Sequence, residues 1–371
     1  MRITSQFDSG NIEVVDATDP NNVQLAIRKD AQSEHAQWFH FRASGVRDIP
    51  LTLRIINAQS CSYPKAWEGS RAVVSTDRKT WTRADTKVVN GELHIRHTSS
   101  SDAVYFAYFA PYSYDRHQDF VAEMAGCAGV AHDVLGVTLD GRDMDRLQVG
   151  TGPTVLWVIG RQHPGETMAS WWMEGFLRRL TDAADPIARA LRERARLHIV
   201  PHMNPDGGFR GHLRTNALGV NLNRVWDAPT MSESPEVKLV RDAMDQSGVD
   251  LGLDVHGDEE LPYNFIAGPD GIPSFSPTLQ AKLDAFLALY ERANPDFQSV
   301  HGYPVAAPGQ ANMSMFTNQV AERYGALAMT LEMPFKDNAN APDAVFGWSP
   351  ERCARLGAST LHPLLEILPS L

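Results

Sequence analysis

The pattern of apolar residues changes near residue 115, and this change constrains the fold more than any other feature of the sequence. Before it, short apolar runs are separated by turn signals, and no long helical pattern occurs. After it, apolar runs of strand length alternate with longer segments of helical spacing. The sequence therefore predicts two domains, residues 1–115 and residues 116–371.

Residues 1–115 are predicted to form an antiparallel β-sandwich. In one expected strand, alternation places Phe39 and Phe41 on one face and Trp38 and His40 on the other, as in a half-buried strand. The aromatic segment 105–114 ends in a Pro-marked turn and is expected to pack between the two domains. The expected strands are residues 11–15, 23–27, 37–42, 51–57, 72–75, 92–97 and 103–109.

Residues 116–371 are predicted to be an α/β domain, although its strand order cannot be derived from the pattern. Continuous apolar runs, typical of fully buried strands, occur at residues 154–160, 196–201, 251–255 and 326–331. Segments with helical spacing occur at residues 167–180, 234–246, 278–293 and 350–367.

Charge excludes some classes of function. The 371 residues carry 34 basic and 45 acidic side chains, a formal charge of −11, and residues 1–115 hold 13 of each sign. The negative excess therefore lies in residues 116–371. A general nucleic-acid or anionic-membrane surface is disfavoured, because it needs a basic excess. Nothing in the sequence indicates an oligomeric state.

The cysteines and the apolar segments bear on the cellular compartment. Cys61, Cys127 and Cys353 are odd in number and widely spaced, which argues against a disulfide framework and against a cysteine-based zinc site. The N-terminus lacks the apolar core of a secretory signal, and no run approaches the roughly 20 apolar residues of a membrane span. We therefore expect a cytoplasmic location.

Residues with metal-binding chemistry follow two of the buried strands. His163 and Glu166 lie where the first strand of the α/β domain ends, and His256 directly follows the third. Together they form the His₂Glu set of a catalytic zinc site, with a position left for water. Singly, a His-x-x-Glu pattern also fits an acidic residue at a helix N-terminus. Asp254 fits either a residue that orients a ligand or a structural hydrogen bond.

A long loop and a late strand supply further polar candidates. Residues 204–227 are dense in Gly, Asn and Arg, and Arg214 and Arg224 present planar forks suited to a carboxylate or an oxyanion. Arg210 in the same loop fits a solvated surface equally well. Glu332 ends a buried-type strand, where burial would raise its pKa towards that of a general base. Taken alone, it also fits a surface residue of an edge strand.

The order of these motifs resembles that of the zinc metallocarboxypeptidases, specifically the cytosolic carboxypeptidase branch. The shared order is His-x-x-Glu, Asn-Pro-Asp-Gly, Arg, Asn-Arg, His and a late Glu, over residues 155–335. Residues 106–114 are also similar to the junction that follows the β-sandwich of that branch. The resemblance implies an α/β fold in which an antiparallel β-sandwich precedes a mixed-sheet zinc carboxypeptidase domain.

The resemblance also implies roles at the reacting bond. One zinc ion would be held by His163, Glu166 and His256. Glu332 would be the general base and later the proton donor, while zinc would lower the pKa of its bound water to about 7. Arg214 would stabilise the oxyanion of the tetrahedral intermediate.

The remaining implied roles concern the substrate, the C-terminus of a peptide or protein. Asn223 and Arg224 would bind its terminal carboxylate. Tyr303 is the candidate, by its position before Glu332, for a tyrosine that related carboxypeptidases use near that carboxylate.

Eukaryotic members of the branch remove glutamates, so an acidic C-terminal residue is a candidate substrate. The negative charge of residues 116–371 would repel a polyglutamate tail, so this specificity would require a local basic pocket. The candidates for such a pocket are Arg161, Arg210, Arg323 and Lys336.

Two other functions stay open. An aspartoacylase-like or desuccinylase-like zinc amidohydrolase, acting on N-acyl amino acids, shares the two metal-binding motifs and an Asn-Arg pair. The predicted sandwich and the Asn-Pro-Asp-Gly loop argue against it. A catalytically idle scaffold is disfavoured because all three ligands and Glu332 are present. We expect the sandwich to shape the active-site rim or to support folding.

Overall fold

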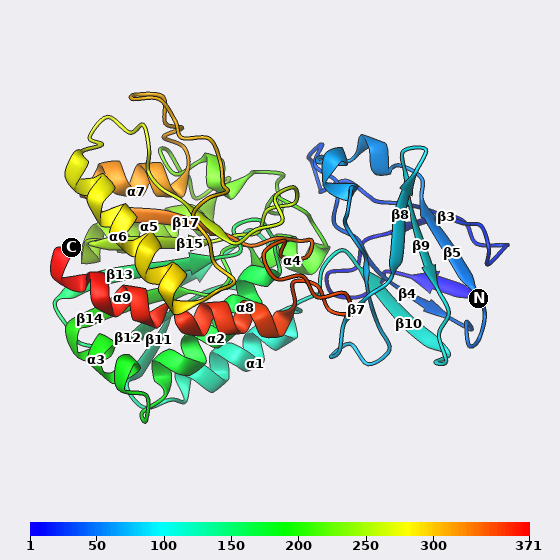
Figure 1. The fold of residues 1–371 in the computed structure, drawn as a ribbon, viewed down its shortest axis with the longest axis horizontal. Coiled ribbons are helices and arrows are strands. Elements are labelled where there is room, and N and C mark those ends of the chain that lie inside the picture. Colours follow the sequence, from blue (N-terminus) through cyan, green and yellow to red (C-terminus); the bar gives the residue numbers. More distant parts are fainter.

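The computed structural model describes residues 1–371 and contains three β-sheets. Two five-stranded sheets are built from residues before Tyr108, and a seven-stranded sheet with helices on both faces forms the rest of the molecule (Figure 1). The predicted fold class, a β-sandwich followed by a mixed-sheet α/β part, is confirmed.

The N-terminal sheets are antiparallel with one exception. Strands β3 and β5 pair in parallel, which the prediction of a purely antiparallel sandwich did not include. Strands β1, β7 and β8 were also missed, because they are short or exposed and carry no buried alternation. In spatial order, one sheet is β1 (Arg2–Thr4), β4 (His40–Ser44), β10 (Ala103–Ala107), β6 (Val73–Ser75) and β7 (Thr82–Arg83); the other is β2 (Glu13–Asp16), β3 (Val23–Ala26), β5 (Leu51–Ile55), β9 (Glu92–His97) and β8 (Asp85–Val89).

The prediction of a half-buried strand at residues 37–42 is wrong, since both faces are buried here. Phe39 and Phe41 are fully buried, as expected, but Trp38 and His40 are each only 1% exposed. The reason is that the N-terminal segment and a neighbouring tryptophan cover the second face. Trp38 donates its indole N–H to the carbonyl of Ser9 at 2.8 Å, and the ring of His40 packs edge-on against Trp81.

The aromatic segment after β10 packs between the two parts, as predicted. Tyr108 stacks on Phe335 with ring centroids 4.5 Å apart, and Tyr112 packs edge-on against Trp171 at 5.0 Å. A continuous cluster of buried apolar side chains therefore runs from the N-terminal sheets into the α/β part. The domain boundary expected between residues 115 and 116 lies in the first turn of α1 (Tyr114–Ala125) and stays a prediction.

The seven-stranded sheet has a parallel centre and antiparallel edges. Strands β14, β13, β15 and β17 are parallel neighbours, while β11, β12 and β16 pair antiparallel. The spatial order is β11 (Val130–Val137), β12 (Asp143–Val149), β14 (Ala195–Val200), β13 (Thr154–Gly160), β15 (Leu251–Val255), β17 (Leu327–Glu332) and β16 (Phe265–Ala267). Because the central strands are parallel, their carboxyl ends lie along one edge of the sheet.

Helices cover both faces of this sheet. One face packs against α5 (Pro235–Ser247) and α7 (Phe316–Tyr324). The other packs against α2 (Met168–Thr181), α3 (Pro186–Arg194), α6 (Pro277–Ala293), α8 (Pro350–Ser359) and α9 (Leu361–Ile367). The short α4 (Pro205–Arg210) follows β14. The single helix expected at residues 350–367 is two helices, because Pro363 has no N–H for the carbonyl of Ser359.

The cysteines and the helices bear on two expectations from the sequence, the lack of a disulfide framework and the lack of a membrane span. The three cysteines are free, and Cys61 and Cys353 are buried. No helix has both the length and the apolar character needed to cross a membrane.

Candidate active site

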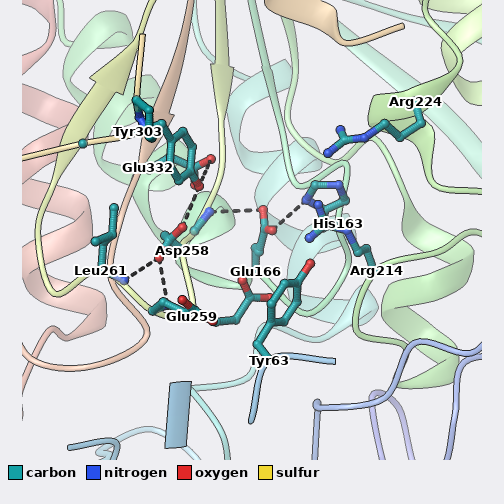
Figure 2. Close-up of a pocket in the computed structure, with 14 residues that line it drawn as sticks. Tyr63, His163, Glu166, Arg214, Arg224, Asp258, Glu259, Leu261, Tyr303 and Glu332 are labelled. Atoms are coloured by element: carbon teal, nitrogen blue, oxygen red, sulfur yellow. Dashed lines mark hydrogen bonds and ion pairs between the residues drawn. The ribbon is translucent and has the colours of Figure 1, made fainter. Parts of the chain in front are cut away.

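Three neighbouring parallel strands deliver the predicted catalytic groups to one edge of the sheet. His163 follows β13, His256 follows β15 and Glu332 is the last residue of β17. Since β13, β15 and β17 are adjacent, their carboxyl ends bring these side chains together: His163 and Glu332 line one cavity (Figure 2), and His256 lies behind its wall, against Glu166.

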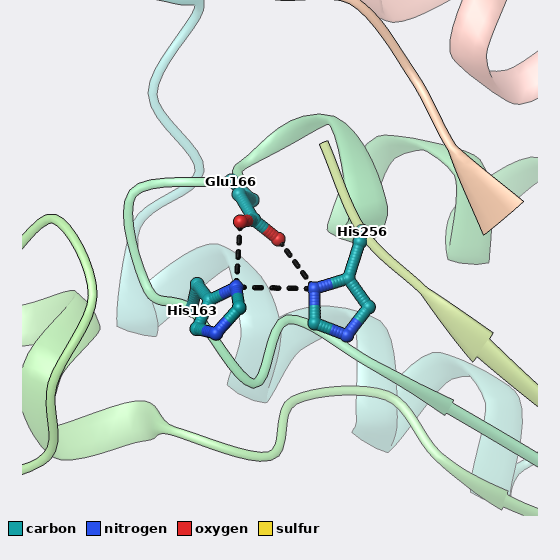
Figure 3. A group of neighbouring side chains, drawn as sticks. All are labelled: His163, Glu166 and His256. Atoms are coloured by element: carbon teal, nitrogen blue, oxygen red, sulfur yellow. Dashed lines mark hydrogen bonds and ion pairs between the residues drawn. The ribbon is translucent and has the colours of Figure 1, made fainter. Parts of the chain in front are cut away.

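His163, Glu166 and His256 form a buried cluster (Figure 3). Nδ1 of His163 lies 2.7 Å from Oε1 of Glu166, and Nδ1 of His256 lies 2.8 Å from Oε2 of the same carboxylate. The two Nδ1 atoms are 3.2 Å apart. The three predicted ligands therefore point at a common centre.

The other ring nitrogen of each histidine is fixed by an oxygen. Nε2 of His256 lies 2.6 Å from Oδ2 of Asp254, and Nε2 of His163 lies 3.1 Å from Oδ1 of Asn221. Neither oxygen can donate a proton when Asp254 is ionised, so the Nε2 atoms are the donors. Both Nδ1 atoms then present lone pairs to the carboxylate of Glu166.

This arrangement fits a metal cation. Two imidazole nitrogens and a carboxylate converge with no positive side chain between them, so the cluster requires a proton or a metal cation at its centre. Burial lowers the pKa of His163 to about 3, so its ring is in the neutral form that binds metals. Although burial acts against it, the carboxylates of Asp254 and Glu166 raise the pKa of His256 well above its usual value. The donor set is the one zinc accepts in catalytic sites.

A backbone turn places His163 and Glu166. Arg161, with a positive φ of 60°, begins the turn and donates from Nε to the carbonyl of Pro164 and from Nη1 to that of Tyr112, both at 3.0 Å. A Cβ on Gly165 would lie 2.9 Å from the carbonyl oxygen of Leu213, so glycine is needed for this close approach. Arg161 therefore supports the turn and does not line the cavity.

Glu332 lies beside Tyr303 and Asp258. The hydroxyl oxygen of Tyr303 is 2.6 Å from Oδ2 of Asp258 and 3.1 Å from Oε1 of Glu332, while Oε2 of Glu332 is buried without a partner. Burial raises the pKa of Glu332 well above its usual value, and the nearby carboxylates of Glu166 and Asp258 raise it further. The side chain is thus placed to take up and release a proton.

Two arginines supply positive charge in the cavity. Arg214 and Arg224 both line it, and burial together with the charge of Arg214 lowers the pKa of Arg224. Asn223, the residue before Arg224, is not among the lining residues; its Oδ1 accepts the backbone N–H of Phe316 at 2.8 Å, which leaves its amide N–H groups as donors. Two adjacent cations of this kind suit an anionic ligand.

Asp30, from the N-terminal part, holds the loop that carries Arg214. Its Oδ1 accepts the backbone N–H of Leu213 at 2.7 Å, and its Oδ2 accepts those of Arg214 at 2.8 Å and Thr215 at 3.0 Å. Asp30 is only 3% exposed. This buried carboxylate is therefore satisfied by the backbone of the active-site loop.

The cavity has a volume of about 510 Å³. Its wall combines the predicted residues with a tyrosine of the N-terminal part and a run of acidic side chains after His256. The lining residues are Tyr63, His163, Glu166, Arg214, Arg224, Gly257, Asp258, Glu259, Glu260, Leu261, Gly302, Tyr303, Pro304 and Glu332. Tyr63 shows that the N-terminal part contributes to the active-site rim, as we expected.

The basic residues considered for an acidic-substrate pocket do not line the cavity. Arg210 forms an ion pair with Asp140, and Arg323 forms one with Asp245. Lys336 is also absent from the cavity wall. The structure therefore gives no support to a basic pocket built from these side chains.

Comparison with known proteins decides the family. The family model described as "Cytosolic carboxypeptidase N-terminal domain" matches residues 3–109, and that described as "Zinc carboxypeptidase" matches residues 128–265. A putative carboxypeptidase A from Shewanella denitrificans is 47% identical in sequence, with a TM-score of 0.98 over 100% of this chain and 99% of that one. The chain belongs to the zinc carboxypeptidase family. It is a zinc-dependent carboxypeptidase, a hydrolase.

This carboxypeptidase is also similar to two proteins named carboxypeptidases and to one uncharacterized protein. A metallo-carboxypeptidase from Pseudomonas aeruginosa, solved in complex with (2-guanidinoethylmercapto)succinic acid, is 43% identical with a TM-score of 0.98 over 100% of both chains. An uncharacterized protein of Zymomonas mobilis is 50% identical over 100% of this chain and 97% of its own length. Human cytosolic carboxypeptidase 4 is 28% identical over 64% of this chain, which corresponds to only 26% of the human protein.

Sequence reasoning missed several residues of the carboxypeptidase site. Asn221 orients His163, but an Asn among many in a loop has no distinguishing pattern. Tyr63 and Asp30 come from the other part of the chain, and no periodicity indicates which residues of a sandwich reach a neighbouring domain. Glu259 lies three residues after His256, and this closeness in sequence was the one available signal.

Proposed function

We propose that this carboxypeptidase removes the C-terminal residue of peptides or proteins in the cavity at the ends of β13, β15 and β17. The observation that carries the proposal is that His163 and Glu166 of the His₂Glu cluster, the buried carboxyl of Glu332 and two arginines line one cavity. A cytoplasmic location, in line with the name of the cytosolic carboxypeptidases, belongs to the same proposal.

One zinc ion would be held by His163 Nδ1, Glu166 and His256 Nδ1, and bound zinc supplies a water of lowered pKa and polarises the scissile carbonyl. Asp254 and Asn221 keep the two rings in the tautomer that frees Nδ1. These residues orient the ligands before substrate arrives.

Glu332 is the proposed general base. Its buried, unpartnered Oε2 accepts a proton from the attacking water and then donates it to the amide nitrogen of the leaving residue. Arg214 donates hydrogen bonds to the developing oxyanion. The buried setting strengthens both interactions, because there is little water to screen them.

Arg224 and Asn223 bind the terminal carboxylate, which restricts cleavage to the last peptide bond. The compound in the Pseudomonas complex supports this assignment, since a succinic acid with a guanidinoethyl group combines carboxylates with one cation. The cavity likewise presents two arginines and several carboxylates. The role of Tyr303 near the terminal carboxylate stays a prediction, and so does a preference for acidic residues.

The test is digestion of a peptide library that varies the C-terminal residue, followed by mass spectrometry. We expect loss of single C-terminal residues, no cleavage of the same peptides with C-terminal amides, and loss of activity with a zinc chelator that is reversed by added zinc. The same preparation should be given N-acyl amino acids. Turnover of these alone would favour the amidohydrolase and overturn the proposal.

A further inference from the structure

One acidic side chain of the cavity has no partner. Glu259 is 5% exposed and lines the cavity, yet its carboxylate makes no ion pair and no hydrogen bond with another residue. Neighbouring Asp258 differs, because it accepts from Tyr303 and from the backbone N–H groups of Glu260 and Leu261. Burial without a partner disfavours the ionised form and raises the pKa of Glu259 to about 8, so a cationic ligand that pairs with this carboxyl would compensate its charge.

The surroundings of Glu259 favour a positively charged ligand. Asp258 and Glu260 line the same wall and add to its negative charge. Across from them lies the ring of Tyr63, an aromatic face that already attracts one cation, since Cζ of Arg214 is 5.6 Å from its centroid. Arg214 brings one positive charge to this end of the cavity against the three acidic side chains, so an ammonium or guanidinium group is complementary to the negative excess.

The position of Glu259 indicates which part of a substrate it meets. In Figure 2, Arg224 lies at one end of the cavity, and Glu259 and Tyr63 lie at the other, with Glu166 and His163 between them. If the terminal carboxylate is at Arg224 and the scissile bond is at the metal ligands, the chain continues towards Glu259. The residue before the scissile bond then faces this carboxylate.

We propose that Glu259, together with the ring of Tyr63, binds a positive charge on the residue that precedes the scissile bond. This subsite rests on the proposed function, because it uses the direction in which the substrate lies. The charge can come from a Lys or Arg side chain or from the free α-ammonium group of a dipeptide. In either case, Glu259 selects the substrate and takes no part in the chemical step.

The experiment compares matched peptides that share the best C-terminal residue from the library. The penultimate residue is lysine, norleucine or glutamate, with the N-terminus acetylated. We expect kcat/KM for the lysine peptide to exceed that for the norleucine peptide at least about tenfold, because one charge-assisted hydrogen bond contributes a factor of this size. The glutamate peptide should be the poorest substrate. Free and acetylated norleucine dipeptides distinguish the two sources, since only the free form has an α-ammonium group.

The Glu259→Gln variant should bring the lysine-to-norleucine ratio to about one. The matched control is Glu193→Gln, at an exposed position of α3, which should keep the wild-type ratio. Zinc content of both variants shows that the metal site is intact. Equal rates for lysine and norleucine in the wild type, or an unchanged ratio in Glu259→Gln, would overturn the inference.

Calorimetric binding of the same peptides to the zinc-loaded Glu332→Gln protein separates this inference from the proposed function. If the lysine peptide binds more tightly than the norleucine peptide, and this difference is lost when Glu259→Gln is added, the cation subsite is supported. If the wild type then cleaves none of the peptides, the carboxypeptidase proposal is refuted and the subsite is not. Equal affinities would refute the subsite even if cleavage is observed.

Discussion

The two parts of the molecule differ in what they do with buried polar groups. In the N-terminal part, the buried carboxylate of Asp30 is satisfied by three backbone N–H groups, and His40, whose pKa burial lowers to about 3, is neutral. In the α/β part, Glu166, Glu259 and Glu332 are buried around one cavity that Arg214 and Arg224 also line, and Oε2 of Glu332 has no hydrogen-bond partner. The difference indicates which part binds ligands, because ionisable groups gathered in a cavity are available to a ligand.

The N-terminal part nevertheless reaches the site through the loop of residues 209–215. Besides Asp30, Asn11 donates its side-chain amide to the carbonyl of Gly211 at 2.9 Å, and the backbone N–H of Ala31 donates to Nε2 of His212 at 3.0 Å. One part therefore supplies reacting groups, and the other holds in place a loop that carries one of them. Three predictions test this division.

The largest effect is expected from Glu332→Gln. This change keeps the size of the side chain but removes the proton acceptor, so kcat should fall by about 10²- to 10⁴-fold. The measurement is steady-state kinetics on the best library peptide, with zinc content determined in parallel. Full activity in this variant would show that the proton acceptor lies elsewhere in the cavity.

Glu236, in the first turn of α5, is a buried carboxyl of the α/β part that does not line the cavity. Its substitution should therefore change stability and leave activity unchanged. Burial raises its pKa from 4.5 to about 7 in the folded protein. Its contribution to stability is therefore present below about pH 4.5 and is lost as the pH rises to about 7. As the pH rises through this range, the free energy of unfolding of Glu236→Gln should increase by roughly 3 kcal/mol relative to that of wild type.

Urea unfolding of both proteins at several pH values between 4 and 8 measures this difference. Glu193→Gln, at an exposed position, is the control and should run parallel to wild type. His40 contributes with the opposite sign, since its lowered pKa makes it stabilising above about pH 6.5 and destabilising below. If the plots of unfolding free energy against pH are parallel for Glu236→Gln and wild type, the carboxyl of Glu236 is ionised in the folded protein.

Much of the fold and the order of the chemical motifs could be predicted, because each rests on a local pattern. Continuous apolar runs identified β13, β15 and β17, and the residues that follow parallel strands must lie along one edge. The contributions of Tyr63 and Asp30 could not be predicted in this way. They depend on how two separately patterned parts pack together, and periodicity within either part contains no such information.

The smallest effect is expected from Asp30→Asn. This variant tests most directly whether the N-terminal part supports catalysis by holding the loop that carries Arg214. The amide has one acceptor oxygen where the carboxylate has two, so either Leu213 or the pair Arg214 and Thr215 loses its acceptor, and the loop is held less firmly. If Arg214 acts on the oxyanion, the loss appears in the transition state, and kcat should fall about tenfold while KM changes little. Asp77→Asn is the control, because Asp77 accepts the backbone N–H groups of Lys79 and Thr80 within the N-terminal part. A merely structural role for Asp30 would lower the melting temperature and leave kcat of the folded protein unchanged.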